Sequence, residues 1–250
     1  MRRYWLDKEF IHKDHVEIAG EVFHHICDVC RQKIGDQFEV LGSKGKAFLV
    51  EIDQLKKKSA TAKIISEREI PPLKQPHIHL AISLPRPAVF DSVLERAVEL
   101  GVASVQPFYS EFSFFREPSE AIEKKLPRWQ KIVMSATQQC GRSELMEIKS
   151  PLYLEKVLGN FNPADAAMGL FAYEGRCDLE IAKALKMHKV SAVRNIWLFV
   201  GSEGGFSKDE VDAFRANRLA PVTLGEQVLR VETACLALIS IIKYEYDLMQ

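Results

Sequence analysis

Short apolar runs separated by turn residues characterise the N-terminal part of the chain. Gln37–Leu41 and Lys46–Ile52 have strand length and flank a glycine-containing turn, which predicts a hairpin. Gly20–Arg31 predicts one short helix, and a further strand is expected to run through Ile65. Several short strands with turn signals between them are typical of a barrel. Residues 1–70 are therefore expected to form a small β-rich unit.

A polar, proline-containing stretch follows this unit. The segment Ser66–Pro76 holds Pro71, Pro72 and Pro76, a composition that favours an extended and fairly stiff connection. We assign residues 71–76 as the linker proper.

Strand-like and helix-like patterns alternate from residue 77 to residue 250. The expected strands are Ile78–Leu84, Ala103–Phe108, Ala167–Tyr173, Arg194–Val200 and Pro221–Leu224. The expected helices are Pro87–Leu100, Ser119–Cys140 with a break at Pro127, one capped by Ser150-Pro151, Asp178–Lys189, and Glu232 to about Leu248. This alternation predicts an α/β domain with a parallel sheet. The last helix is apolar almost all round, so either the domain core or a second subunit must cover it.

A glycine-rich loop follows the expected strand that ends at Val200. Gly201, Gly204 and Gly205 let the backbone turn sharply and approach a ligand closely. We expect Gly205 to require a small residue because ligand or backbone passes close to it, so that Gly205→Val abolishes cofactor binding.

A helix is expected to begin directly after this loop, because Ser207 and Glu210 have the spacing of a capping box. A strand, a glycine loop and a helix N-terminus together suit a nucleotide-like ligand held on backbone amides. The common phosphate motifs do not fit. Phe206 follows Gly205 where a P-loop needs lysine, and the loop lies too late in the chain for a dinucleotide fingerprint.

Two C-terminal motifs, GSEGGFSKDE at 201–210 and LGEQVLRVETA at 224–234, carry a family resemblance. The chain resembles the ribosomal RNA small subunit methyltransferase E family, within the knotted SPOUT methyltransferases. The resemblance extends in order to HHICDVCRQKIGD at 24–36, LERAVELGV at 94–102 and QQCGR at 138–142. Ser202 replaces the family's usual proline, which is expected to loosen the loop, and Gln227 replaces a usual arginine.

The resemblance implies an N-terminal PUA-like β-barrel that binds RNA and a C-terminal SPOUT α/β domain with a deep trefoil knot. It also implies a homodimer formed through the C-terminal region. The implied activity is S-adenosylmethionine-dependent methylation of N3 of one uridine in 16S rRNA of the small ribosomal subunit. Two alternatives stay open: a non-catalytic RNA-binding protein of the same fold, which Ser202 and Gln227 would support, and a SPOUT methyltransferase acting on another RNA position.

On this resemblance, three loops would build the cofactor pocket, running from Phe171 to Gly175, from Gly201 to Phe206 and from Leu224 to Arg230. The cofactor-binding residues would be Phe171, Leu198, Gly201, Gly204, Gly205, Leu224, Gly225, Leu229 and Thr233. Leu198, Leu224 and Leu229 would sandwich the adenine ring; the alternative is that these leucines belong only to the core.

Arg230 is the residue expected nearest the chemistry, because an arginine there can hold a uracil oxygen or a phosphate bidentately. The alternative is a structural ion pair with Glu232 or Glu203. Gln138 and Arg142 are expected to reach the same cleft as substrate contacts. In the N-terminal unit Arg2, Arg3 and the turn lysines are candidate phosphate contacts, although exposed lysines in turns are mostly only solvated.

Composition narrows the remaining choices. The 34 basic and 34 acidic residues give zero net charge, so RNA recognition would rest on local patches and shape. Five cysteines and the lack of an apolar leader favour a reducing cytosol, and no apolar run approaches the length of a membrane span. The Cys27–Cys30 pair, with His24 and His25 nearby, lacks the further ligands of a zinc site, and the histidines at 77 and 79 make only two. No metal is expected.

Overall fold

The computed structural model describes residues 1–42, 45–161, 167–175, 181–187 and 193–249. The chain forms two compact units. The first comprises Met1–Pro72 together with Met134–Leu145, and the second comprises Leu73–Val133 together with Met146–Gln250.

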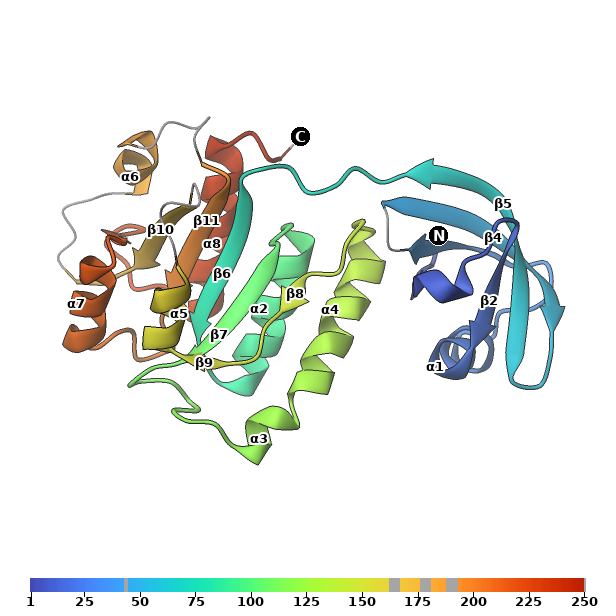
Figure 1. Ribbon diagram of the computed structural model, residues 1–250, viewed down its shortest axis with the longest axis horizontal. Coiled ribbons are helices and arrows are strands. Elements are labelled where there is room, and N and C mark those ends of the chain that lie inside the picture. Colours follow the sequence, from blue (N-terminus) through green and yellow to red (C-terminus); the bar gives the residue numbers. More distant parts are fainter. Residues whose placement is uncertain (43–44, 162–166, 176–180, 188–192, 250) are drawn as a thin grey trace. The chain divides into compact units, whose positions relative to one another are not determined.

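The first unit is built on a five-stranded sheet (Figure 1). Its strands are β1 Arg3–Leu6, β2 His15–Ala19, β3 Gln37–Gly42, β4 Lys46–Leu55 and β5 Ser59–Glu69, in the spatial order β1-β3-β4-β5-β2. β1 pairs with β3 in parallel, and the other pairs are antiparallel. The 3₁₀ turn η1 Lys8–Phe10, the short helix α1 Gly20–Phe23 and the π-helical turn η2 His24–Val29 complete it. The expected β-rich unit with one short helical segment is present.

Alternating burial explains why these segments form strands with one face toward a core. Along β2, Val16 and Ile18 are buried, whereas Glu17 and Ala19 are exposed, which is the period of two that a half-buried strand requires. The buried side chains pack with Phe38 and others in one cluster.

The strand β5 corrects the expected start of the polar connection at Ser66. It continues to Glu69, because its pairing with β4 runs as far as Lys46 opposite Glu69. Cross-strand hydrogen bonding thus overrides the polar composition of this segment. The peptide bond between Gln75 and Pro76 is cis.

The second unit contains a seven-stranded parallel sheet. Its strands are β6 His77–Ser83, β7 Ser104–Tyr109, β8 Glu147–Ile148, β9 Leu152–Tyr153, β10 Ala167–Ala172, β11 Asn195–Val200 and β12 Ala220–Val222. The spatial order is β12-β10-β11-β6-β7-β8, and β9 also pairs with β7. Each of these pairings is parallel. The expected α/β class with a parallel sheet is therefore confirmed.

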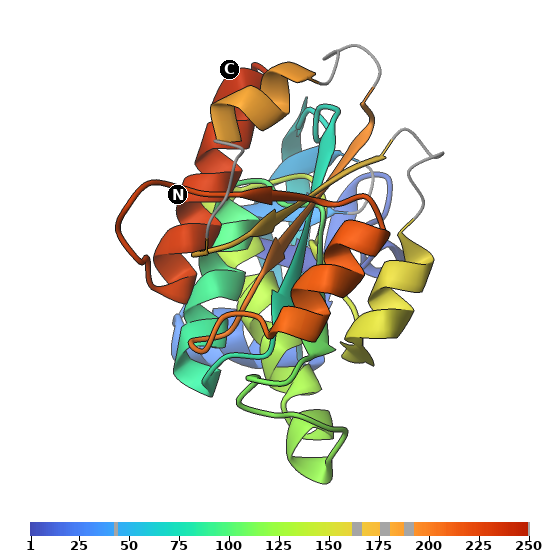
Figure 2. The same cartoon turned by 90° about the vertical axis from the view of Figure 1, so that its left-hand side faces the viewer.

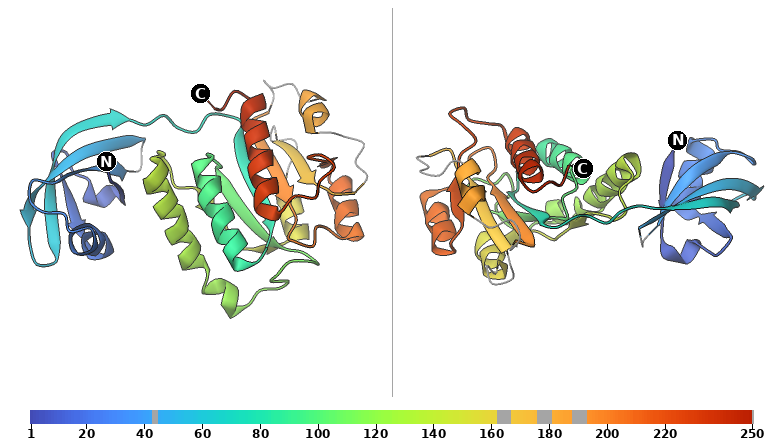
Figure 3. Two further views of the ribbon diagram at one scale, coloured as in Figure 1. Left: turned by 180° about the vertical axis from the view of Figure 1, so that it is seen from behind. Right: turned by 90° about the horizontal axis from the view of Figure 1, so that it is seen from above.

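Helices cover both faces of this sheet. The helices described after residue 77 are α2 Pro87–Glu99, α3 Glu120–Glu123, α4 Leu126–Cys140, α5 Leu154–Asn160, α6 Ile181–Met187, α7 Lys208–Ala216 and α8 Val231–Glu245, and α4 from Met134 onward belongs to the first unit. α2 and α8 lie side by side on one face, and α5 and α7 lie on the other (Figures 2 and 3).

Two helix boundaries differ from the sequence expectation. Ser150-Pro151 does not cap a helix: Leu152 and Tyr153 first pair with β7, and Tyr153 is the N-cap of α5. The expected break at Pro127 lies earlier, between α3 and α4, so that Pro127 occupies the first turn of α4, where a missing amide hydrogen costs nothing. Much of the expected helix at 178–189 lies outside the described residues, and α6 forms its described part.

The helix α8 is covered on one side only. Six side chains are buried, including Ala234, Leu238 and Ile242, and they face α2 and β11. Ala237 and Ile241 are only half-buried, and Tyr244, one turn further along, is 75% exposed. An apolar stripe of α8 therefore remains open within one chain.

Candidate functional site

The carboxyl ends of three adjacent strands meet at one pocket in the second unit. β10 lies between β11 and β12, so the segments that follow these three strands emerge together at one edge of the sheet. Ligand sites of parallel sheets commonly lie at that edge. The pocket is lined by the last residue of each strand and by residues that follow it: 172–174 at β10, 200–202 and 204–206 at β11, and 222–229 at β12, with Val231 and Ala234 of α8.

The glycine loop after β11 is shaped by close backbone packing. A Cβ atom on Gly201 would lie 3.0 Å from backbone atoms of Gly205, and one on Gly204 would lie 2.7 Å from Cβ of Phe112. Gly205 differs, because no atom of the described residues lies within 4 Å of its Cβ position, but its φ is +69°. A close passage of backbone is therefore not the reason for Gly205, whereas a close passage of ligand stays a prediction. Its requirement is the left-handed backbone conformation.

Side chains of the protein itself already cap the N-terminus of α7, the helix that follows this loop. Ser207 is the N-cap of α7, its Oγ accepts from the amide of Glu210, and the Glu210 carboxylate accepts from the amide of Ser207. The predicted capping box is thus confirmed. The same carboxylate also accepts from the amide of Glu111 at 2.8 Å. Because Glu210 occupies the positive end of α7, the amides around Ser207 and Glu111 are directed at a carboxylate of this chain.

A second loop, residues 110–114 after β7, is fastened to the glycine loop. The hydroxyl of Ser202 donates to the carbonyl of Phe112 at 2.6 Å, and Ser202 is only 5% exposed. Since this bond ties the two loops together, the expectation that Ser202 loosens the glycine loop does not hold. At the base of the 110–114 loop, the hydroxyls of Ser83, Ser110 and Ser113 hydrogen-bond one another in the interior.

The fastened loop presents two phenylalanines to solvent. Phe112 is 41% exposed and Phe114 is 54% exposed, although both follow a fully buried strand. Phe112 touches the glycine loop at Gly204, which lines the pocket. Sequence reasoning missed this pair. Its available signal was the run Phe112-Ser-Phe114-Phe115, which has too many aromatic residues for a solvated loop.

The charges on the pocket lining have one sign. Among the described lining residues, the charged side chains are Glu174 and Glu226, and both are exposed. Val222, Leu224, Leu229 and Val231 give an apolar wall. A phosphate-bearing ligand would meet like charge here, whereas a ligand with positive charge would be favoured.

Six of the expected cofactor residues are brought together by the pocket: Gly201, Gly204, Gly205, Leu224, Gly225 and Leu229. The structure places three others elsewhere. Phe171 and Leu198 are fully buried, and Phe171 stacks on Phe214 at 4.7 Å within the core. Thr233 is exposed on the first turn of α8 and is not among the described lining residues.

Arg230 is the N-cap residue of α8, and its carbonyl accepts from the amide of Ala234 at 2.8 Å. Its side chain is exposed, directly after the pocket residue Leu229. The alternative pairing with Glu203 is not formed, because Glu203 instead accepts from the amide of Arg86 at 3.1 Å. In the described part of the chain, no ion pair joins Arg230 to Glu232 either.

The four other expected substrate contacts belong to the first unit. Arg2, Arg3 and Gln138 line a shallow polar pocket there. Arg3 is held by Glu39 and by the carbonyl of Gln139, both at 2.9 Å, and Gln138 accepts from the amide of Trp5. Burial lowers the pKa of Arg142. Arg3 and Gln138 therefore have structural partners, and Arg2 is the most exposed of the group.

Two residues noted in the sequence, His79 and Cys27, have packing roles. His79 lies between Ser104 and Asn195, which contact its two ring nitrogens at 2.7 and 3.0 Å, and its ring stacks on Trp197. Burial lowers the pKa of His79, which favours the neutral ring. Cys27 packs against the core of the first unit.

Comparisons with known proteins identify the class of the fold and its site. A family model described as an RNA methyltransferase domain matches residues 71–243, and one described as an RNA methyltransferase PUA domain matches residues 18–65. The protein is thus an RNA methyltransferase with an N-terminal PUA domain. None of the helices in the described residues is long and apolar enough to cross a membrane.

Individual relatives narrow the class to one family. Ribosomal RNA small subunit methyltransferase E from Aquifex aeolicus is 32% identical over 225 residues, covering 89% of this chain and 91% of the relative. The chain belongs to the ribosomal RNA small subunit methyltransferase E family.

Solved structures agree with this assignment. The family member from Neisseria gonorrhoeae, bound to S-adenosyl methionine, has a TM-score of 0.84 and 27% identity, covering 98% of this chain and 97% of that chain. A protein from Legionella pneumophila in complex with the bound cofactor SAM has a TM-score of 0.86 and 26% identity, covering 97% and 96%.

Proposed function

We propose that this protein transfers a methyl group from S-adenosylmethionine to N3 of one uridine in 16S rRNA of the small ribosomal subunit. The observation that carries the proposal is the pocket at the ends of β10, β11 and β12, which combines glycine loops, an apolar wall and acidic side chains. We place the reaction in the cytoplasm, where small subunits are found.

The pocket residues fit S-adenosylmethionine. Its uncharged adenine ring needs an apolar slot, and Leu224 and Leu229 lie on the lining. Its sulfonium and ammonium groups are positive, so Glu174 and Glu226 favour them where they would oppose a phosphate. We keep Gly201, Gly204, Gly205 and Gly225 as the backbone cradle. Phe171 and Leu198 then act from the core by holding the strands whose ends form the pocket.

The chemistry asks mainly for alignment and charge stabilisation. When bound, S-adenosylmethionine supplies an electrophilic methyl carbon on its sulfonium. The uracil N3 would act as the nucleophile only after losing its imide proton, which would pass to solvent. Arg230, exposed beside the pocket, would donate to a uracil oxygen and steady the charge that develops on the ring.

The target base must leave its stack to reach this pocket, and the exposed rings of Phe112 and Phe114 offer it a surface. The loop carrying Phe112 is tied to the glycine loop by the bond from Ser202 to the Phe112 carbonyl, which holds the backbone of Phe112 beside the pocket. Base–aromatic stacking contributes roughly 1–3 kcal/mol per base.

Three further properties belong to the proposal. The first unit would hold RNA by shape and by phosphate contacts, with Arg2 as its most exposed candidate among the expected contacts. A second chain would cover the open stripe of α8 at Ala237, Ile241 and Tyr244, giving a homodimer. The C-terminal segment would pass through a deep trefoil knot, which membership of this family supports.

The decisive experiment combines cofactor binding with product analysis. Calorimetry should show S-adenosylmethionine binding to the full chain. Incubation with small subunits from a strain lacking the endogenous activity should yield N3-methyluridine in the digested 16S rRNA. If the protein binds S-adenosylmethionine but the digest contains a different methylated nucleoside, the enzyme acts on another RNA position. If it does not bind S-adenosylmethionine, the non-catalytic RNA-binding alternative is favoured. The subunit and free 16S rRNA should be compared side by side.

A further inference from the structure

A tight hairpin in the first unit places three metal-ligating side chains on one face. Ile11 pairs with Val16 as an antiparallel bridge, and the amide of His12 donates to the carbonyl of His15 at 2.9 Å. His12 and His15 are therefore cross-strand neighbours on either side of a two-residue loop. Glu17 lies two residues after His15 on β2 and shares its face, because side chains of a strand alternate.

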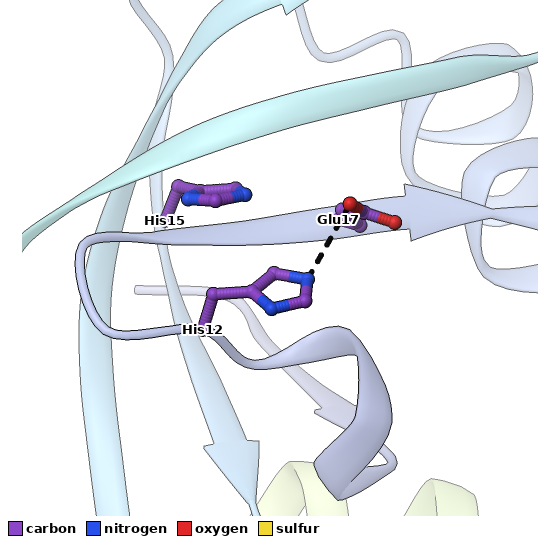
Figure 4. Close-up of side chains that lie close together, drawn as sticks. All are labelled: His12, His15 and Glu17. Carbon is purple, nitrogen blue, oxygen red and sulfur yellow. Dashed lines mark ion pairs between the residues drawn. The ribbon is translucent and has the colours of Figure 1, made fainter.

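The three side chains converge, as Figure 4 shows. One ligand atom from each of His12, His15 and Glu17 lies within 4.8 Å of the other two. Nε2 of His12 is 3.4 Å from a carboxylate oxygen of Glu17, and the two imidazole rings stack at 4.6 Å. Within the described residues, no other such group of three or more potential ligands is present. We name these residues the His12–His15–Glu17 cluster.

A fourth residue, Asp14, orients one of the ligands. Its carboxylate lies 2.7 Å from Nδ1 of His15, and its carbonyl accepts from the amide of Ile64 on β5, which holds the loop in place. An ionised carboxylate only accepts, so Nδ1 of His15 carries the proton and Nε2 keeps its lone pair for a metal. A carboxylate behind a histidine is the usual second partner of a zinc-ligating imidazole.

The charges of the group match a divalent cation. Asp14 and Glu17 supply two negative charges, and the imidazoles bind in their neutral form. Lys63 lies opposite His15 in the strand register, but its side chain is exposed and can extend into solvent. Lys13, in the loop itself, is exposed as well.

We propose that the His12–His15–Glu17 cluster binds a divalent transition-metal ion of the zinc class, with Asp14 as the positioning residue. Two histidines and one glutamate form a known zinc donor set that leaves a fourth position open. Imidazole ligands select against Mg²⁺ and Ca²⁺, which take oxygen. At bond lengths of about 2.0–2.1 Å, tetrahedral ligands lie roughly 3.3 Å apart, close to the His12–Glu17 distance already present. The sequence-based expectation of no metal is revised by this proposal.

The test is a titration of the metal-stripped full chain with ZnCl₂, followed by calorimetry and by thermal melting. We expect one saturable site per chain and a zinc-dependent rise in melting temperature. His15→Ala and Glu17→Gln should each weaken binding at least about tenfold, and Asp14→Asn should weaken it about 10- to 100-fold. These side chains are wholly or partly exposed, so the variants should fold, which circular dichroism checks.

A matched control is available in the same unit. His24 contacts Asp28 at 2.8 Å, an exposed histidine–carboxylate pair for which the described residues offer no third ligand, so His24→Ala should leave zinc affinity unchanged. A competing site is Cys30, whose sulfur lies 3.9 Å from His25. The proposal is overturned if Cys30→Ser abolishes binding while His15→Ala retains it, or if wild type and His15→Ala bind zinc equally.

Discussion

Replacing Gly205 isolates the cost of one backbone conformation in the cofactor loop. The residue has φ of +69° and open space at its Cβ position, so alanine there clashes with no described atom of the protein itself. The left-handed conformation costs an ordinary residue about 1–2 kcal/mol, which corresponds to roughly 5- to 30-fold in an equilibrium constant. Asparagine tolerates this conformation much better. Gly205→Ala should therefore be impaired, and Gly205→Asn much less so.

The free-energy cost of the left-handed conformation should appear either in the Kd for S-adenosylmethionine or in the melting temperature. If the loop relaxes in the free protein, restoring it on binding should raise the Kd for S-adenosylmethionine about 5- to 30-fold. If the surrounding structure holds the loop, the same free energy should lower the melting temperature, by about 2–4 °C per kcal/mol for a domain of this size. Calorimetry and thermal melting on the same samples account for both.

Gly159→Ala is the matched control. Its Cβ position is also open, but Gly159 has no positive φ and lies in the helix α5, where alanine is favoured. This variant should bind and melt like wild type or be slightly more stable. If Gly205→Ala matches wild type in both assays, or if Gly205→Asn is as impaired as Gly205→Ala, the conformational argument is refuted.

Three other predictions test different parts of the molecule. Phe112→Ala should lower kcat/KM for methylation about 5- to 150-fold with an unchanged Kd for S-adenosylmethionine, since it removes about 1–3 kcal/mol of base stacking; an unchanged kcat/KM argues against stacking of the target base on Phe112. Tyr244→Glu should give a monomer in light scattering where wild type is a dimer, without loss of fold, because Tyr244 is 75% exposed; a Tyr244→Glu dimer would place the interface elsewhere. Arg68 and Arg3 hold the pKa of Glu39 below its usual range, so stability present above the unfolded-state pKa of about 4.3 is lost as pH falls through the folded value. In Glu39→Gln the melting temperature should fall less steeply as the pH is lowered. The same fall in both proteins would contradict this prediction.

Features that depend on neighbouring residues in the sequence could be predicted. The capping box of Ser207 and Glu210 forms within one helical turn, so its spacing alone indicates it. The hairpin of β3 and β4 and the alternation of strands and helices after residue 77 follow from local apolar periodicity. The three loops expected to meet do line one pocket, because parallel strands bring their carboxyl ends to one edge.

Features that depend on contacts between distant segments were decided by the tertiary structure alone. β5 extends to Glu69 because β4 offers it hydrogen-bond partners, against the polar composition of that stretch. Gly204 is restricted by Phe112, which lies 92 positions earlier in the chain, and Ser202 finds its acceptor on the same loop. The periodicity of apolar residues in the sequence does not predict these contacts between the glycine loop and the 110–114 loop.

The same division separates the candidate sites. The glycine motifs mark the pocket because their backbone freedom is visible in the sequence, whereas Phe171 and Leu198 are as apolar as lining residues yet lie in the core. The His12–His15–Glu17 cluster depends on a two-residue hairpin loop that brings His12 across from His15. The residues of that loop, Lys13 and Asp14, do not predict a hairpin from their composition. Residue type and spacing thus determined which chemistry this chain can carry. Burial and strand pairing, which arise only when distant segments pack, decided which of those residues can reach a ligand.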